Sequence, residues 1–346
     1  MPRRENVVDR PTVIDTVKGE PKERQRFVFK QLLKRKNVVD LLGLLIPVVA
    51  FSFAPHFYSN EILLISMMIY IALAQGVNVI YGLTGYLPFG YVGFYGVGAY
   101  GTSLAILDLH VAPEIAIVIG GLVSAILALV LTPLLKLSGS YFAIATLATA
   151  EALYALIANP SLKNITQGPY GINIGAVYSS GGSYVVAVVL LGLSILTVVV
   201  IKRSRLGLAL RAIRNDPVSA SLSGVNVVLE RTKAWVVAAA IAGLAGGVFA
   251  WTITIFYPSA VFDISISVFA IVFALFGGVG TTFGPIVGAV VLYGLYSYIG
   301  VTQPQYFQLI FGVIIVIFVL FLPKGVAGIA NALIRRFRMR TIREEA

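Results

Sequence analysis

Long apolar segments alternate with short polar links along almost the whole chain. A helix needs about 20 mostly apolar residues to cross the ~30 Å hydrocarbon core of a bilayer. Ten segments approach or reach this length, and they cover residues 38–54, 62–81, 87–107, 115–135, 141–158, 183–201, 234–256, 264–276, 285–299 and 307–322. The pattern predicts an all-α polytopic membrane protein with about ten transmembrane or re-entrant helices.

The one long polar interruption is residues 202–233, between the sixth and seventh apolar segments. Its first half has helical spacing, with an apolar face and a separate basic face. The apolar positions are Leu206, Leu210 and Ile213, and the basic positions are Arg211 and Arg214. We therefore expect a short amphipathic helix here.

A second short helix is expected directly after the first. Asp216 offers an N-cap carboxylate, and Pro217 suits the first helical position, where its missing N–H costs nothing. Gly224 is placed to end this helix in a left-handed turn. Residues 202–233 thus predict a polar hairpin of two helices that stands out of the membrane domain and contacts a partner in water.

The composition agrees with a membrane protein. Of the 346 residues 58% are hydrophobic and 12% are charged, and the mean hydropathy is +0.91, whereas a soluble domain carries about 25% charge. The chain has no Cys, which excludes disulfides and thiolate metal sites.

The net charge of +11 is concentrated in three places. Residues 1–36 hold eleven Lys and Arg, the 202–233 segment holds seven, and the end of the chain from Lys324 holds six. Basic clusters beside membrane spans stay in the cytoplasm, and ten crossings put all three on one side. This distribution favours cytoplasmic N- and C-termini and argues against nucleic acid binding. The predicted parts are a basic arm (1–37), a membrane domain (38–323) and a basic tail (324–346).

Glycine is concentrated at residues 82–101 and 277–289. Gly280, Gly284 and Gly288 are four apart, a spacing that makes a smooth stripe for close helix packing. Broken helices rich in glycine also form polar sites at mid-membrane in transporters. Packing therefore explains most of these glycines, and the first cluster is also a candidate for the substrate path.

Few residues carry recognisable chemistry. Glu151 is the one acid deep in a predicted span, so it is expected to face protein or water, in a structural or gating role or as a contact to a substrate ammonium or a partner helix. Residues 96–101 match G-x-G-x-x-G inside an apolar span, without the strand and acidic residue of a dinucleotide site. No phosphate-binding G-x-x-x-x-G-K-[ST] motif occurs, so any ATP and Mg²⁺ must be bound by another subunit.

Four ordered blocks resemble the permease subunit of branched-chain amino acid ABC importers, the LivM-like type. They extend over residues 82–100, 141–172, 207–246 and 277–325, and include Gly82-Leu83-Thr84-Gly85, Tyr141-Phe142-Ala143-Ile144, Ala212-Ile213-Arg214 with Asp216, and Gly277-Gly278 with Gly284-Pro285. Each block alone is weak evidence for the family, but four blocks in the same order are strong evidence.

The resemblance implies a permease half in the cytoplasmic membrane of a prokaryote. It pairs with a second permease, two cytoplasmic ATPases and an extracytoplasmic binding protein. The resemblance also assigns the coupling loop that docks on an ATPase, with Gly207, Leu210, Arg211, Ile213, Arg214, Asp216, Pro217, Ala220 and Gly224.

The candidate substrate-path residues are Tyr86, Pro88, Phe89, Gly90, Tyr91, Gly93, Phe94, Thr146 and Glu151. Tyr86, Pro88 and Tyr91 stand where the family usually has Gln, Ser and His, which leaves urea or short amides as alternative substrates. A stand-alone secondary transporter or channel is a further alternative, but paired intramembrane charges for ion coupling are missing. A membrane-bound enzyme would need a cluster of His, Asp and Glu, which the sequence lacks.

Overall fold

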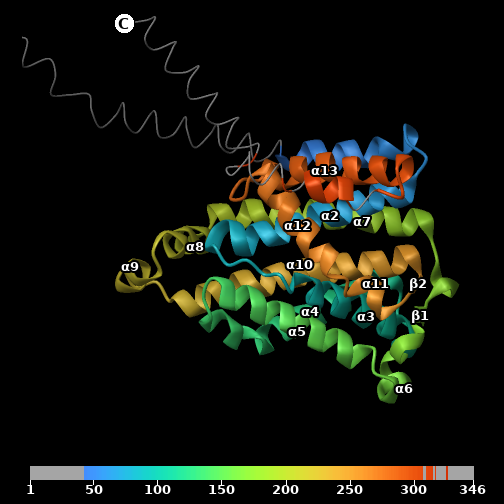
Figure 1. The fold of residues 1–346 in the computed structure, drawn as a ribbon, viewed down its shortest axis with the longest axis horizontal. Coiled ribbons are helices and arrows are strands. Elements are labelled where there is room, and N and C mark those ends of the chain that lie inside the picture. The colour runs from blue at the N-terminus through green and yellow to red at the C-terminus, as the bar shows by residue number, and fades with distance from the viewer. Residues whose placement is uncertain (1–42, 307–308, 315, 317–324, 326–346) are drawn as a thin grey trace, which may run out of the picture. The chain divides into compact units, whose positions relative to one another are not determined.

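The chain is described from a computed structural model, which covers residues 43–306, 309–314, 316 and 325 (Figure 1). The predicted basic arm, nearly all of the basic tail and most of the last apolar segment lie outside these residues. The first helix extends over Gly43–His56, with a 3₁₀ turn at Ala54–His56.

Long helices make up most of the described chain. They are α2 (Glu61–Val77, continued by a π-helical turn at Asn78–Gly82), α3 (Tyr91–Leu109), α4 (Pro113–Val130), α5 (Ser140–Ile157), α7 (Ser180–Arg203), α10 (Val227–Ile253), α12 (Ile264–Gly277) and α13 (Phe283–Thr302). The short elements are α6 (Lys163–Thr166), β1 (Ile172–Asn173), α8 (Arg205–Asn215), α9 (Pro217–Leu222), β2 (Ile255–Phe256) and α11 (Pro258–Val261), with 3₁₀ turns at Thr132–Lys136, Pro160–Leu162, Gly168–Tyr170 and Gly175–Val177.

Seven helices within the described residues are long and apolar enough to cross a membrane. They correspond to seven of the ten predicted segments, so the chain is an all-α polytopic membrane protein. Glycine and tyrosine lower the hydropathy of α3, which is not among the seven although it occupies the predicted third segment. Ten spans and cytoplasmic termini remain predictions.

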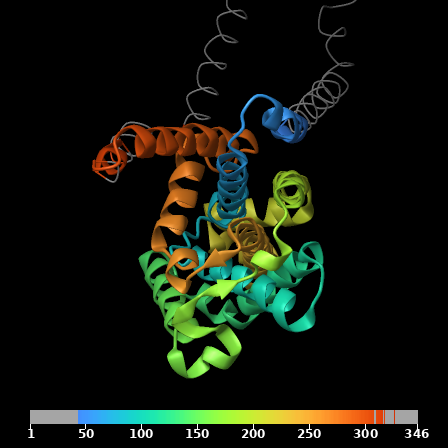
Figure 2. The ribbon, with the colours of Figure 1, turned by 90° about the vertical axis from the view of Figure 1, so that its right-hand side faces the viewer.

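The helices α2, α7 and α10 are seen almost end-on in Figure 2, with α10 in the middle of the bundle. α10 packs against α2, α3, α4 and α7. It approaches α3 so closely that a Cβ on Gly98 would overlap the backbone of Gly243. Small residues let helix backbones come together in lipid, where no hydrophobic effect drives helices into contact.

The outer faces of the bundle are apolar. Large hydrophobic side chains stay exposed along α4, α5 and α7, among them Ile115, Leu122, Ile126, Tyr141, Ile144, Val185, Val189 and Val200. A soluble monomer rarely exposes apolar patches of this extent. These faces are suited to lipid or to another membrane subunit.

The two ends of the bundle carry different structures. α8 and α9 lie at one end, and β1, β2 and α6 lie at the other (Figure 1). β1 and β2 pair antiparallel, Ile172 opposite Phe256, which adds a two-stranded sheet to the predicted all-helical architecture. The hairpin and the 159–182 loop are thus at opposite ends, as the predicted alternation of crossings requires.

The glycine stripe predicted for residues 280–288 is wrong at its first position. Gly280 lies before α13 with φ +81°, a left-handed conformation in the turn that separates α12 from α13. Gly284 and Gly288 are on α13 and face α12, because a Cβ on either would overlap the backbone of that helix or of the turn after it. Equal spacing in sequence cannot reveal that the helix begins only at Phe283.

Candidate functional site

The predicted hairpin is formed by α8 and α9, and its local signals are confirmed. Gly207, Leu210 and Ile213 are the buried residues of α8. The Asp216 carboxylate accepts hydrogen bonds from the backbone N–H groups of Val218 (3.0 Å) and Ser219 (3.3 Å), so it caps α9. Pro217 is at the first helical position, Ala220 is buried, and Gly224 has φ +84°.

Two arginines of α8 bind backbone carbonyls. Arg211 donates through Nε to the carbonyl oxygen of Gly207 (2.9 Å) and through its guanidinium to that of Lys202 (2.8 Å), which ties α8 to the end of α7. Arg214 donates instead to the carbonyl oxygen of Gly82, at the end of the π-helical turn after α2. A cation at a helix C-terminus is favourable because the last carbonyls lack helical partners.

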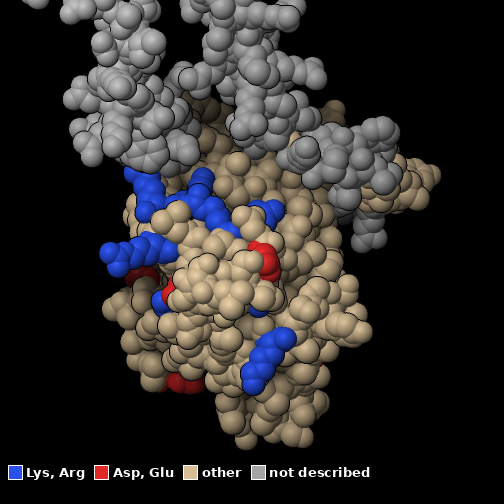
Figure 3. Space-filling view, turned by 90° about the vertical axis from the view of Figure 1, so that its left-hand side faces the viewer, with Lys and Arg blue, Asp and Glu red and all other residues tan. Residues whose placement is uncertain are grey.

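The hairpin also reaches the break between α12 and α13. Lys202 Nζ donates to Thr282 Oγ1 (3.0 Å), and a Cβ on Gly280 would stand 3.6 Å from an Arg214 guanidinium nitrogen. Both glycine-rich segments therefore lie against the base of the hairpin. Figure 3 looks at this end of the bundle and shows Lys and Arg side chains gathered there.

Buried amides of α2 bind the same break. Gln75 Nε2 donates to the carbonyl oxygen of Thr282 (2.8 Å). Asn78 Nδ2 donates to the carbonyl oxygen of Thr281 (2.7 Å), and Asn78 Oδ1 accepts from the backbone N–H of Gly280 (2.6 Å). These bonds satisfy backbone groups that a broken helix leaves open inside the membrane. They join two breaks in the helices: the first break, at the π-helical turn Asn78–Gly82 after α2, and the second break, between α12 and α13. The two breaks are thus held together as one unit.

The connecting loop (residues 85–90) leads from the first break to α3. At its end, the Gly90 N–H donates to Thr146 Oγ1 of α5 (3.3 Å), and the Val92 N–H donates to Ser267 Oγ of α12 (2.7 Å). The start of α3 is thus held by side chains from two other helices. It is a broken-helix terminus of the kind that forms binding sites in transporters.

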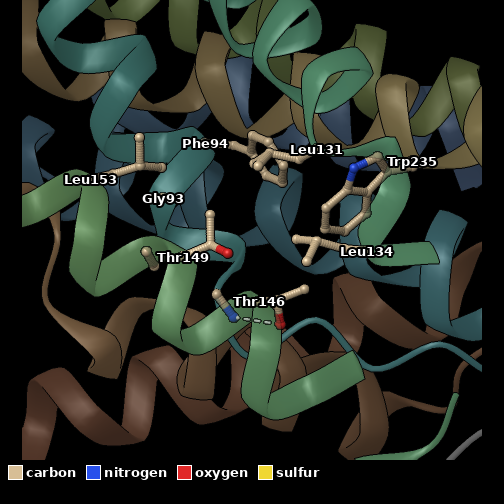
Figure 4. A pocket seen from close by; sticks show the side chains of 10 residues that line it. Gly93, Phe94, Leu131, Leu134, Thr146, Thr149, Leu153 and Trp235 are labelled. Carbon is tan, nitrogen blue, oxygen red and sulfur yellow. Dashed lines mark hydrogen bonds between the residues drawn. The ribbon is translucent and has the colours of Figure 1, made fainter. Parts of the chain in front are cut away.

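A small cavity borders this terminus (Figure 4). Gly90, Gly93, Thr146 and Trp235 are among the residues that line it, and its volume is about 10 Å³. That volume holds about one water molecule, so the space between α3, α5 and α10 is closed to an amino acid in this conformation.

A larger cavity of about 240 Å³ lies between α2, α3, α10, α11, α12 and α13. Its walls are mainly aromatic and hydroxyl-bearing, with one carboxylate at Asp263; the lining includes Ser66, Tyr70, Tyr95, Ser265, Phe269, Tyr293 and Tyr296. No pattern in the sequence indicated this cavity, because its residues are scattered over six helices.

Similarity to known proteins decides the family. The model of the permease component of branched-chain amino acid transport systems matches residues 60–319, a range that contains the hairpin, both breaks and every candidate path residue. The chain belongs to this permease family.

Relatives of the permease are found in bacteria and archaea. The high-affinity branched-chain amino acid transport system permease proteins LivM of Salmonella typhimurium and Escherichia coli are 32% and 31% identical to it, over 74% of this chain and 67% of each relative. The probable branched-chain amino acid transport permease protein LivH of Methanocaldococcus jannaschii is 28% identical, over 79% of this chain and 90% of the relative. No solved structure matches the permease.

Apart from Glu151, the candidate path residues divide into three groups in the permease. Tyr91 and Phe94 are fully packed inside the bundle, and the Tyr91 hydroxyl donates to the carbonyl oxygen of Ala238 (2.7 Å). Tyr86 and Phe89 are half-buried in the connecting loop, where they remain candidates for contact with a substrate. Pro88, Gly90, Gly93 and Thr146 are buried around the small cavity or beside it.

Glu151 lies on the exposed face of α5, away from the packed interior of the permease. Within the described residues its carboxylate takes part in no hydrogen bond or ion pair, so no such bond supports a structural role there. The gating role and a contact outside the chain, with a partner helix or a substrate, stay predictions.

Three polar residues of the site were not predicted from sequence. Gln75 and Asn78 hold the two breaks together, and Arg231 of α10 is buried against Tyr86. The signal for Gln75 and Asn78 was present, because two amides in an otherwise apolar span must find partners inside the membrane domain. Arg231 was counted with the basic loop, although α10 begins at Val227 and includes it.

The Asp216 cap sets an expected pH dependence. Hydrogen bonds from the Ser219 hydroxyl and the Val218 N–H lower the pKa of Asp216 from its ordinary value of 3.8. A carboxylate whose pKa is lowered on folding stabilises the folded state at pH values above its ordinary pKa. This stabilisation is lost only as the pH falls through the lowered pKa. We expect hydrogen exchange of the α9 amides to show unchanged protection between about pH 8 and about pH 5. Asp216→Ala removes protection throughout this range, whereas Asp216→Asn, another good N-cap, retains it; equal loss in both variants would contradict the cap.

Proposed function

We propose that this permease forms one half of the membrane path of an ATP-driven importer of branched-chain amino acids, and that a separate ATPase docks on the α8–α9 hairpin. The hairpin itself carries the argument. It stands at one end of the bundle and exposes large apolar side chains, Leu208 (64%), Val218 (68%) and Leu222 (85%), beside its arginines. Exposed apolar residues with a basic rim are typical of a protein-binding surface.

The contacts at the base of the hairpin provide a route for the motion. Arg214 bonds the end of α2, and Lys202 bonds Thr282 at the α12–α13 break. A displacement of the hairpin by the ATPase then moves both breaks, because Gln75 and Asn78 join them. The connecting loop follows directly from the first break and closes the space at Thr146.

The second half of the path is a partner permease on the face of α5. Glu151 is exposed on that face within a membrane-spanning helix. An acidic side chain at the bilayer centre costs about 2.5–3.5 kcal/mol on insertion scales, so this face is better suited to a protein or to a water-filled path than to lipid. Glu151 then lies where a substrate ammonium passes between the two subunits.

The complete importer contains two permeases, two ATPases that bind ATP and Mg²⁺, and a solute-binding protein. The binding protein meets the β1–β2 end, opposite the hairpin. In this proposal the hairpin and both termini are in the cytoplasm of a prokaryotic cell. The permease itself carries out no catalysis.

Reconstitution tests the proposed function. We expect the permease alone in vesicles to give no uptake and no ATPase activity, and the complete complex to take up leucine only with ATP inside the compartment that holds the hairpin. Labelling of a cysteine introduced at Leu222, which is 85% exposed, reports the side of the hairpin. Leucine flux through the isolated chain, or labelling of Leu222→Cys from the side of the binding protein, would contradict the proposal.

A further inference from the structure

Arg231 is a buried cation with no anionic partner in the described part of the chain. It lies one turn into α10 and is 9% exposed. Among the described residues no carboxylate is within ion-pair distance of it, and its Nε–H has no hydrogen-bond acceptor. The neighbouring Glu230 binds Lys233 instead (2.8 Å). A buried guanidinium normally has a paired anion, because removal from water is costly.

The ring of Tyr86 covers the guanidinium in place of an anion. The Arg231 Cζ atom is 4.1 Å from the centre of the ring. Such a cation–π contact recovers part of the lost solvation, about 0.5–2 kcal/mol. It leaves the hydrogen-bonding capacity of Nε unused, so Tyr86 is a partial substitute for a carboxylate.

A second unpartnered donor lies one helical turn further along α10. Trp235 is 1% exposed, and its indole N–H has no acceptor in the part of the chain that the structure describes. Residues four apart share a helix face, and the two donors border one aromatic group: the Tyr86 ring is 5.0 Å from that of Phe142, which is 5.6 Å from that of Trp235. Trp235 also lines the small cavity beside Gly90 and Thr146.

We infer that Arg231 and Trp235 form a binding position for the carboxylate of the transported amino acid, at the hairpin end of the path. The inference rests on the proposed function. Guanidinium and indole are donors without acceptor capacity, so they recognise an anion and reject an ammonium. The rings of Tyr86 and Phe142 offer an apolar wall beside them for an aliphatic side chain.

The site is closed in this structure. The adjoining cavity measures about 10 Å³, and the Tyr86 ring occupies the face of the guanidinium. The cavity is too small for a substrate carboxylate, so the connecting loop that carries Tyr86 has to move before the carboxylate can reach the N–H groups of Arg231. Substrate binding and loop position are therefore coupled through the space beside the guanidinium.

Fluorine NMR tests the site, since the chain has two tryptophans, Trp235 and Trp251. The full chain is labelled with 5-fluorotryptophan in lipid nanodiscs, and Trp251→Phe assigns the signals. The probes are leucine, 4-methylpentanoate, which lacks the ammonium, and 3-methylbutylamine, which lacks the carboxylate. We expect leucine and 4-methylpentanoate to shift the Trp235 signal and the amine to leave it unchanged.

Charge variants make the result specific. Arg231→Gln should weaken binding of both carboxylates about tenfold or more, since charge-assisted hydrogen bonds are roughly twice as strong as neutral ones. Lys233→Gln, which removes a charge from a side chain 47% exposed two residues away, should bind as the unmodified chain does. An unchanged Trp251 signal shows that Arg231→Gln is folded.

Three results overturn the inference: an equal shift with the amine, binding that survives Arg231→Gln, or no response to either carboxylate. Inorganic phosphate that shifts the signal as strongly as leucine also counts against it, because it indicates a general anion site. These outcomes are distinct from failure of the proposed function, which is measured as ATP-driven leucine uptake by the unmodified complex. If the complex takes up leucine but the Trp235 signal does not respond to it, the proposed function stands and the carboxylate position is refuted.

Discussion

Replacing Arg214 with alanine should uncouple ATP hydrolysis from amino acid uptake while the permease still inserts and assembles. Arg214 is the residue of α8 that bonds the end of α2, through the carbonyl oxygen of Gly82. A hydrogen bond from a charged donor contributes about 1.5–3 kcal/mol, which corresponds to a 10- to 100-fold change in the equilibrium between two positions of the helix break. We expect uptake per ATP hydrolysed to fall by about tenfold or more.

The measurement is leucine uptake and ATP hydrolysis in the same proteoliposomes. Arg205→Ala is the matched control, because Arg205 is an exposed arginine of α8 that makes no hydrogen bond or ion pair within the described chain. Arg205→Ala should leave the uptake per ATP hydrolysed near the value for the unmodified complex. Arg214→Lys keeps the charge and one donor, so an intermediate ratio is expected. If Arg205→Ala and Arg214→Ala reduce the ratio equally, the effect belongs to hairpin charge and the route through Gly82 is refuted.

Local signals explain why the hairpin could be predicted in detail. Asp216, Pro217 and Gly224 each act within a few residues of themselves, through a cap, a fixed φ and a left-handed turn. The signals for the membrane-spanning helices are equally local, because a run of about 20 apolar residues both predicts such a helix and forms it. These features follow from the sequence because no distant residue is needed to form them.

Contacts between distant segments were not accessible in this way. Gln75 and Thr282 are 207 positions apart, and nothing in the sequence around either residue indicates the other as its partner. The same holds for the pairing of Ile172 with Phe256, which adds a sheet that periodicity over two residues cannot indicate. The start of α10 at Val227 was also missed, because Arg231 and Lys233 were assigned to the loop by charge alone.

The candidate path was predicted by segment and not by residue. Residues 86–94 do lie at the broken start of α3, beside Thr146. Within that range, however, burial separates Tyr91, bonded to Ala238 inside the bundle, from Tyr86, whose ring faces Arg231. The family resemblance makes both tyrosines candidates for the substrate path, and only the packing of α10 against them distinguishes their roles.

Gly98→Ala, at the contact of α3 with α10, should cause a large loss of stability. A methyl group there would overlap the Cα, carbonyl carbon and carbonyl oxygen of Gly243. Backbone atoms cannot move aside as a flexible side chain does, so the two central helices must separate. Overpacking of a core typically costs 1–3 kcal/mol, which exceeds the gain of about 1 kcal/mol from alanine's helix propensity. We expect a lower denaturation midpoint in detergent and less protein eluting as a folded species.

Gly101→Ala is the matched control, because it is the same substitution three residues along the same helix. Its nearest neighbour would be the Gly120 Cα at 3.4 Å, an ordinary contact. Only the propensity gain then remains, and the midpoint should stay equal or rise slightly. Equal midpoints for the two variants would show that α3 and α10 can separate at little cost. The close approach of Gly98 to Gly243 would then not be what holds the centre of the bundle together.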